Sequence, residues 1–225
     1  MLLKVNGEEG VCTIENVKAI LFDLDGTLIN TLDLHIEAFQ WILRKLGKNV
    51  TKSELEGMMG RTPHDIIKTF MSDISPEDAW KAATEKEGYL ETLIKEVRPF
   101  PGVENLLDLL EQKGVTRVVI SSTYRELVKT LLRNAGLLKN VDYIVSGEDI
   151  TKGKPDPEPF KKGLAITGLK ETEVVGIGDS IHDALSCTGA GIRFIGVLTG
   201  KTDIRAFKDI GIDCVITTFQ HLEII

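Results

Sequence analysis

The chain has 225 residues, of which 42% are hydrophobic and 27% are charged, a composition typical of a globular protein rather than a disordered or fibrous one. Its net charge is −7 and it contains no dense cluster of Lys and Arg, which argues against a nucleic-acid partner. No stretch is apolar for long enough to span a membrane, and the opening residues, MLLKVNGEEGVC, do not have the pattern of a signal peptide.

The cysteines indicate a reducing compartment. Cys12, Cys187 and Cys214 are odd in number and far apart, and no CxxC or Cys/His pair supports a zinc site. We therefore expect three reduced thiols in a cytoplasmic protein. Residues 1–16 form an N-terminal extension to which the sequence assigns no role.

Along the chain, short apolar runs alternate with longer helical patterns, as in βα units on a parallel sheet. Hydrophobic residues recur at helical spacing between several of these runs, for example Leu127, Val128, Leu131 and Leu132. The predicted strands are Lys18–Asp23, Arg117–Ser121, Tyr143–Ser146, Glu173–Ile177, Arg193–Val197 and Asp213–Ile216.

The segment from Thr31 to about Pro99 interrupts this alternation, because it contains no convincing strand. Helical patterns are predicted there after Leu32 and around Ser53–Met59, Pro63–Met71 and Pro76–Val97. The prolines Pro99 and Pro101 then mark a linker. We predict an α/β fold with a doubly wound, Rossmann-like parallel sheet, formed by residues 1–30 and 100–225, and an inserted α-helical domain at 31–99.

Asp23 and Asp25 stand at the carboxyl end of the first predicted strand, where open α/β sheets bind their ligands. Residues i and i+2 of an extended chain point to the same side, so both carboxylates can face one pocket. Two acids at close range repel, and a hard cation such as Mg²⁺ would relieve the repulsion. Gly26 allows a tight turn and Thr27 adds a hydroxyl, although a solvated turn would have the same composition.

Two further stretches could hold an anion. Ser121, Ser122 and Thr123 follow a predicted strand and precede a helical pattern, where hydroxyl and backbone N–H groups can bind a phosphate, although N-capping is the more common role. Lys154 precedes Pro155, which holds it in an extended loop, where its charge could pair with a phosphate oxygen or remain solvated.

The stretch VVGIGDSIHDA supplies two more acids. Asp179 follows a predicted strand, and Asp183 lies four residues later, one helical turn away. Two acids at this spacing disfavour a helix unless a cation is near, and Asp179 or Ser180 could instead cap the helix. All these residues fall at carboxyl ends of predicted strands or just beyond them, so the fold would bring them to one edge. Together they predict a Mg²⁺ site that accepts a phosphate group.

The four motifs FDLDGT, the strand end at Ser121, GKP with Lys154, and GDSIHD resemble, in order, those of the haloacid dehalogenase superfamily. The helical insert is similar to the C1 cap of its phosphoglycolate phosphatase and β-phosphoglucomutase branch. The similarity covers roughly residue 17 to the end of the chain.

The resemblance implies a role for each matching residue. Asp23 would be the nucleophile that forms an aspartyl-phosphate, and Asp25 the general acid and base. Ser121 and Lys154 would hold the transferring phosphoryl group. Mg²⁺ would be bound by Asp23 and Asp179 and by the backbone carbonyl of Asp25, and Asp183 would ligate or support the metal.

Further comparison with the branch narrows the function. Haloacid dehalogenases lack the second acid, so Asp25 argues against dehalogenation. β-Phosphoglucomutases share a histidine at the place of His35, which we expect to pack at the base of the cap, but they carry an arginine where this chain has Pro63. Asn30, where many phosphatases of the branch have an acid, and the later KPDPEP are similar to the branch's pyrophosphatases. Arg61 would lie on a cap loop near the substrate or be solvated.

We therefore predict a Mg²⁺-dependent phosphatase that acts on a small phosphorylated metabolite, phosphoglycolate or a sugar phosphate in the first place. Candidate substrate contacts are Thr27, His35, Arg61, Ser121, Ser122 and Lys154. The alternatives are a pyrophosphatase, a phosphomutase, or a receiver domain that holds phosphate as a signal. A receiver domain is disfavoured because it is smaller and has no helical insert after its first strand. The sequence makes no prediction of the oligomeric state.

Overall fold

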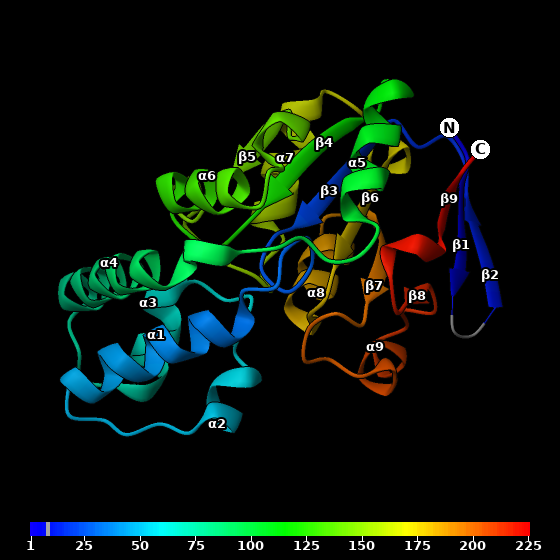
Figure 1. Ribbon diagram of the computed structural model, residues 1–225. Helices are drawn as coiled ribbons and strands as arrows, with labels where there is room; N and C mark the ends of the chain where they lie inside the picture. The colour runs from blue at the N-terminus through cyan, green and yellow to red at the C-terminus, as the bar shows by residue number, and fades with distance from the viewer. Residues whose placement is uncertain (8–9) are drawn as a thin grey trace.

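The computed structural model describes residues 1–7 and 10–225. Six parallel strands form its central sheet in the order β5-β4-β3-β6-β7-β8 (Figure 1). Their bounds are β3 Ala19–Asp23, β4 Thr116–Ile120, β5 Tyr143–Val145, β6 Val174–Gly178, β7 Arg193–Val197 and β8 Val215–Ile216. The predicted strands are confirmed, with ends that differ by no more than two residues.

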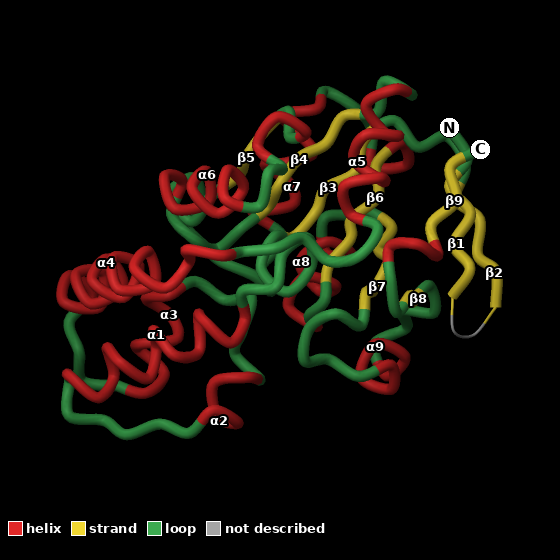
Figure 2. The backbone as a smooth tube through the Cα atoms, in the orientation of Figure 1, coloured by secondary structure: helices red, strands yellow, loops and turns green. Residues whose placement is uncertain are grey.

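Helices cover both faces of this sheet, because each strand is apolar on both sides (Figure 2). On β3, Ile20 and Phe22 pack with the helices of one face, whereas Ala19 and Leu21 pack with those of the other. The first face holds α5 (Val103–Gln112) and α6 (Arg125–Asn134); the second holds α7 (Glu158–Thr167), α8 (Ile181–Gly189) and α9 (Ile204–Asp209). Short 3-10 turns occur at η1 Ile94–Glu96, η2 Leu138–Asn140, η3 Glu171–Glu173 and η4 Phe219–His221. The fold class is the predicted doubly wound α/β arrangement.

A helical layer lies beyond the carboxyl ends of the strands (Figure 1). Its members are α1 Leu32–Lys45, α2 Lys52–Glu56, α3 Pro63–Phe70 and α4 Pro76–Leu93, which share an apolar core of their own. Ile29 and Pro99 pair in an antiparallel bridge, so the chain leaves and re-enters the α/β part at one place. The division into domains at residues 31 and 99 stays a prediction.

The two ends of the chain form a second sheet, which the sequence did not predict. Strands β1 (Leu3–Gly7) and β2 (Gly10–Ile14) pair antiparallel, and β9 (Leu222–Ile224) pairs with β1 on its other side. Leu3 and Val5 are fully buried and join the main core. The sequence assigned no role to residues 1–16, because the strand that pairs with β1 lies at the far end of the chain.

The expectation of three reduced thiols is contradicted by the structure. Cys12 and Cys214 form a disulfide whose Cα atoms are 6.2 Å apart, and Cys187 is buried as a free thiol. Cysteine number and spacing do not reveal this pair, because the two residues are separated by 202 positions and meet only through the terminal sheet. The disulfide ties β2 to the residue before β8.

Reduction of this disulfide should lower the free energy of unfolding by about 2–4 kcal/mol, because the bond closes a long loop in the unfolded chain. Denaturant titrations with and without dithiothreitol would measure the loss. Cys12→Ser should be destabilised by a similar amount and should no longer respond to the reductant. A wild-type protein with three reactive thiols in denaturant, before any reduction, would contradict the pairing.

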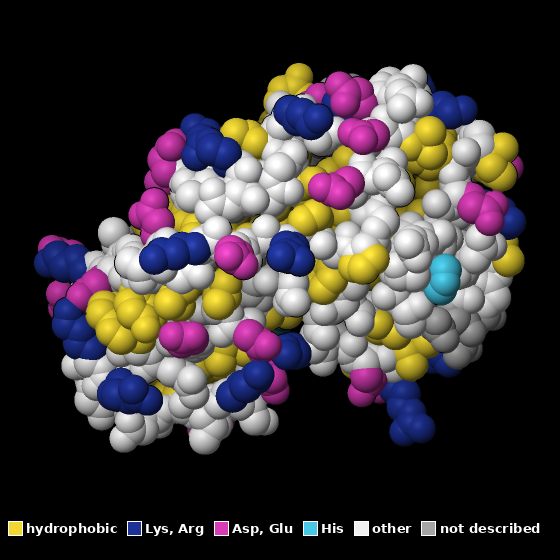
Figure 3. Space-filling model, in the orientation of Figure 1, with side chains coloured by type: hydrophobic (Ala, Val, Ile, Leu, Met, Phe, Trp, Pro, Cys, Tyr) yellow, Lys and Arg dark blue, Asp and Glu magenta, His cyan; other side chains and the backbone are white. Residues whose placement is uncertain are grey.

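The distribution of charge on the surface agrees with the sequence, which contains no dense cluster of Lys and Arg. Figure 3 shows basic and acidic side chains interspersed over the face it draws, without a large block of one sign. Within the described residues, no helix combines the length and the apolar character needed to cross a membrane.

Candidate active site

Parallel strands bring the predicted site residues to one edge of the sheet. Asp23 is the last residue of β3, Ser121 follows β4 and Asp179 follows β6. Asp183 lies in the first turn of α8, and Lys154 lies on the loop between β5 and α7. Residues separated by more than 150 positions thus meet at the point where the order of the strands changes direction, the usual ligand position of such sheets.

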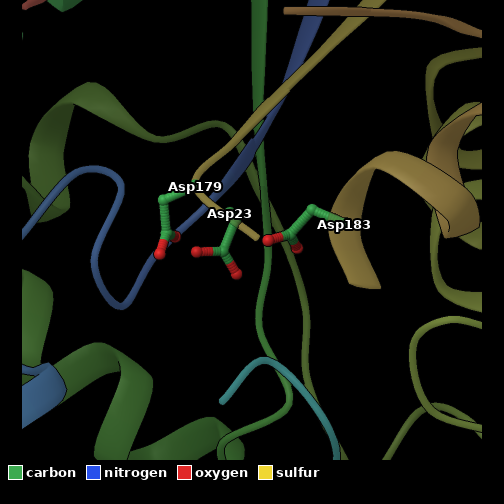
Figure 4. A group of neighbouring side chains, drawn as sticks. All are labelled: Asp23, Asp179 and Asp183. Carbon is green, nitrogen blue, oxygen red and sulfur yellow. The ribbon is translucent and has the colours of Figure 1, made fainter. Parts of the chain in front are cut away.

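Three buried carboxylates converge at this edge (Figure 4). Asp23, Asp179 and Asp183 each place one oxygen within 4.8 Å of those of the other two. The Lys154 ammonium donates a hydrogen bond to Asp23 Oδ1 at 2.6 Å and to the backbone carbonyl of Ile120 at 2.9 Å. It also lies 2.6 Å from Asp183 Oδ1, with which it forms a second buried ion pair.

The charges of this cluster do not balance, since three acids face one lysine. Burial, reinforced by the charge of Asp183, raises the pKa of Asp23 to about 7, and burial and Asp23 raise the pKa of Asp179 well above its usual range. Although burial opposes it, the acids raise the pKa of Lys154, so its ammonium stays charged. Oxygen ligands with an excess of negative charge fit a hard divalent cation such as Mg²⁺.

Asp183 contributes to the helix as well as to the cluster. Ser180 caps α8 by accepting a hydrogen bond from the Asp183 N–H at 3.1 Å, and Asp183 Oδ2 accepts one in return from the Ser180 N–H at 3.1 Å. This reciprocal capping box orients the Asp183 side chain so that its other oxygen faces Lys154. Of the two capping alternatives, Ser180 is correct, and capping and charge clustering occur together.

Asp25 has a different environment, and its side chain is not part of the three-carboxylate cluster. Its Oδ1 accepts a hydrogen bond from Thr31 at 2.6 Å and contacts His35 Nε2 at 3.1 Å. Its Oδ2 accepts weaker bonds from the hydroxyls of Ser121 at 3.3 Å and Thr123 at 3.4 Å. Although burial acts to raise it, the pKa of Asp25 is lowered to about 2 by the contact with His35 and by the hydrogen bond from Thr31. The predicted metal contact of Asp25 through its backbone carbonyl stays a prediction.

We expected His35 only to pack at the base of the helical layer, but it also makes polar contacts there. Its second ring nitrogen, Nδ1, lies 2.9 Å from the ammonium of Lys86, which is fully buried on α4. Because Lys86 donates to Nδ1, the ring proton lies on Nε2 and His35 donates to Asp25. Sequence analysis missed Lys86 and Thr31, and it named Thr123 only as part of the hydroxyl-rich stretch after β4, not as a neighbour of Asp25. The available signal was its helical register, since Lys86 falls on the same face as Ala79, Ala82, Ala83 and Leu90.

The other predicted contacts are placed as follows. The Thr27 hydroxyl donates to Asp179 Oδ1 at 2.7 Å, so it holds an acid of the cluster. Ser122 donates to the carbonyl of Gly60 at 2.6 Å, which joins the helical layer to the strand edge. Neither Ser121 nor Ser122 caps α6, because the N-cap of that helix is Tyr124. Arg61 lies 3.4 Å from Thr69 and lines a cavity of about 30 Å³ that Asp23, Asp25, His35 and Ser122 also line.

The chain matches the haloacid dehalogenase-like hydrolase family over residues 20–197. It belongs to this family. The matched range contains the whole carboxylate cluster, whereas both cysteines of the disulfide and all three strands of the terminal sheet lie outside it. The chain is therefore a hydrolase of this family, with a family core and an additional terminal sheet.

Relatives of known name share most of the chain. A pyrophosphatase, PpaX, of Halalkalibacterium halodurans is 31% identical over 85% of this chain and 89% of its own. A phosphoglycolate phosphatase of Thiobacillus denitrificans is 28% identical over 91% of this chain and 93% of its own. Among solved structures, a HAD hydrolase of Entamoeba histolytica superposes with a TM-score of 0.82 at 26% identity, over 92% of this chain and 96% of that one.

Proposed function

We propose that this member of the family is a Mg²⁺-dependent phosphatase that hydrolyses a small phosphate monoester through an aspartyl-phosphate on Asp23. The observation that carries the proposal is the position of Lys154, whose ammonium lies 2.6 Å from both Asp23 and Asp183. It pairs the candidate nucleophile, Asp23, with Asp183, a second member of the carboxylate cluster, and the site lies beside a small cavity beneath the helical layer. The names of the relatives support a phosphorylated substrate.

Asp23 is the residue that we assign to the first chemical step. One oxygen of its carboxylate attacks phosphorus, so that an O–P bond forms while the bond between phosphorus and the leaving oxygen breaks. Lys154 orients Asp23, and Ser121 and Lys154 offer donors for the phosphoryl oxygens. Asp23, Asp179 and Asp183 would hold Mg²⁺, which supplies positive charge to the carboxylates and the phosphoryl group.

Asp25 is the residue that we assign to proton transfer. Before substrate binds it is a carboxylate, given its pKa of about 2. A phosphate ester would bring negative charge beside Asp25 and raise its pKa, so that it could carry a proton to the leaving oxygen. Once the alcohol has left, the carboxylate accepts a proton from the water that attacks the aspartyl-phosphate. The four hydrogen-bonding neighbours of Asp25 fix its two oxygens for both steps.

The cavity favours a short leaving group. Its volume of about 30 Å³ holds no more than a few water molecules, so the helical layer has to move for substrate to enter and then excludes water on closing. Apolar side chains make up much of its lining, and Arg61 is the cationic side chain among its lining residues. We therefore propose phosphoglycolate first, as a short ester with one further anionic group, and small sugar phosphates next.

A pyrophosphatase is the second candidate, favoured by the 31% identity to the enzyme of that name. Pyrophosphate is also small and anionic, and Arg61 could pair with its leaving phosphate. A phosphomutase is less favoured, because Pro63 lines the cavity at the place where a charged substrate-binding residue would be needed.

The test is phosphate release with Mg²⁺ from a panel of phosphoglycolate, sugar phosphates, nucleotides, pyrophosphate and p-nitrophenyl phosphate. We expect one short anionic substrate to dominate and a chelator to abolish its turnover. Interconversion of sugar phosphates faster than phosphate release would instead indicate a mutase. A stable phosphorylated protein without turnover would indicate a receiver domain.

Lys86→Met should lower kcat on the proposed substrate by about tenfold to a hundredfold, because His35 loses the group that fixes its tautomer toward Asp25. Because Lys86 orients His35 rather than touching substrate, KM should change less than kcat. Steady-state kinetics on the substrate from the panel would separate the two. Lys81→Met, on the same helix but at an exposed position, is the matched control and should leave both constants unchanged. A fall in KM and kcat by equal factors would contradict the assignment.

A further inference from the structure

The loop after β7 meets the carboxylate cluster through a residue without a side chain. A Cβ atom built on Gly200 would lie 1.8 Å from Asp179 Oδ2, 2.6 Å from its Cγ and 2.8 Å from its Cβ. Non-bonded atoms do not approach so closely, so the bare backbone of Gly200 packs directly against the Asp179 carboxylate. Any larger residue at position 200 requires Asp179 or the loop to move.

The conformation of the backbone is not the reason for glycine here. Gly200 is not among the described glycines with a positive φ, so an L-amino acid could adopt its backbone angles. Gly26 differs, since its φ of 92° favours glycine in any case. The requirement for glycine at position 200 therefore comes from its close contact with Asp179 and not from its φ angle.

The backbone of Gly26 also packs against the Asp179 carboxylate. A Cβ on Gly26 would lie 2.7 Å from Asp179 Oδ2, so this oxygen is enclosed by the backbones of two glycines. The other oxygen, Oδ1, accepts the hydrogen bond from Thr27 at 2.7 Å. The Thr199 hydroxyl donates a hydrogen bond to the Gly26 carbonyl at 2.6 Å, which links the loop that carries Gly200 to the turn at Gly26. The Asp179 carboxylate has little freedom to rotate in this cradle.

We propose that Gly200 is a positioning residue of the cation site. Its bare backbone leaves room for Asp179 in the observed orientation, which brings a carboxylate oxygen within 4.8 Å of those of Asp23 and Asp183. The inference rests on the proposed function for the identity of the cation. A methyl group at position 200 displaces one of three candidate ligands, and Mg²⁺ affinity is expected to fall by about tenfold to a hundredfold, as for other groups that orient metal ligands.

Isothermal titration calorimetry with Mg²⁺ tests the proposal directly on Gly200→Ala and wild type. Gly88→Ala is the matched control, because Gly88 is exposed, has no positive φ, and a Cβ there would meet nothing within 4 Å. We expect weaker binding in Gly200→Ala only. Unchanged Mg²⁺ affinity in a folded Gly200→Ala protein would overturn the proposal.

A double-mutant cycle keeps the proposal testable if Gly200→Ala is poorly folded or if wild type binds no Mg²⁺. Gly200→Ala should lower the free energy of unfolding by less in an Asp179→Ala background than in wild type, because Asp179→Ala removes two of the three short contacts. Equal losses in both backgrounds would show that Gly200 acts elsewhere and would overturn the role. Absence of Mg²⁺ binding by wild type, with the coupling present, would instead refute the cation of the proposed function and leave the contact between Gly200 and Asp179 established.

Discussion

Asp23→Asn should abolish phosphate release, with a fall in kcat on the order of 10⁴-fold or more, as for other catalytic nucleophiles. An amide of the same shape cannot form the aspartyl-phosphate, although it can still occupy the space between Lys154 and the other acids. The loss should therefore appear in kcat with the protein folded. Burial and the charge of Asp183 raise the pKa of Asp23 to about 7, so a neutral side chain is well tolerated at this position.

Acid-quenched mass spectrometry adds a second readout for the nucleophile. Wild type incubated with substrate should gain the mass of one phosphoryl group on the peptide that contains Asp23, and Asp23→Asn should not. Asp33→Asn, which alters an exposed acid of α1, is the control and should turn over as wild type does. Undiminished turnover by Asp23→Asn, or a phosphoryl group on another residue, would contradict the assignment of Asp23 as the nucleophile.

Lys154→Met should reduce both stability and activity. The ammonium is almost completely buried between Asp23 and Asp183, and its loss leaves their charges uncompensated. Removing one partner of a buried ion pair costs about 3–5 kcal/mol. The loss of a donor to the phosphoryl group should lower kcat by on the order of 10²–10³-fold. Urea unfolding and steady-state kinetics would measure the two effects.

The cation proposal makes the stability loss depend on Mg²⁺. In a chelator, the loss in Lys154→Met should be largest, and added Mg²⁺ should recover part of it, because a second positive charge then faces the acids. Lys152→Met is the matched control on the same loop: its side chain is 73% exposed, and its substitution should change stability by less than about 0.5 kcal/mol. A stability loss in Lys154→Met that is identical with and without Mg²⁺ would contradict a cation at this cluster.

Most of the candidate site could be predicted because its residues lie next to strong local signals. The apolar run before Asp23 predicts a buried strand, and parallel strands place their carboxyl ends at one edge whatever the details of packing. Ser121, Asp179 and Lys154 follow from the same rule. Asp25 could be placed near Asp23 by strand geometry, but its separation from the three-carboxylate cluster could not, since it depends on Thr31 and His35 of a different layer.

The sequence by itself determined the doubly wound sheet, the helical insert and the edge where the acids meet, because hydrophobic periodicity reports which face of each element is buried. Only the tertiary structure decided which distant residues touch. The pairing of β1 with β9, the Cys12–Cys214 disulfide, the contact of Lys86 with His35 and the fit of Gly200 against Asp179 all join separate segments. Such contacts depend on the packing of whole elements, which no local pattern encodes.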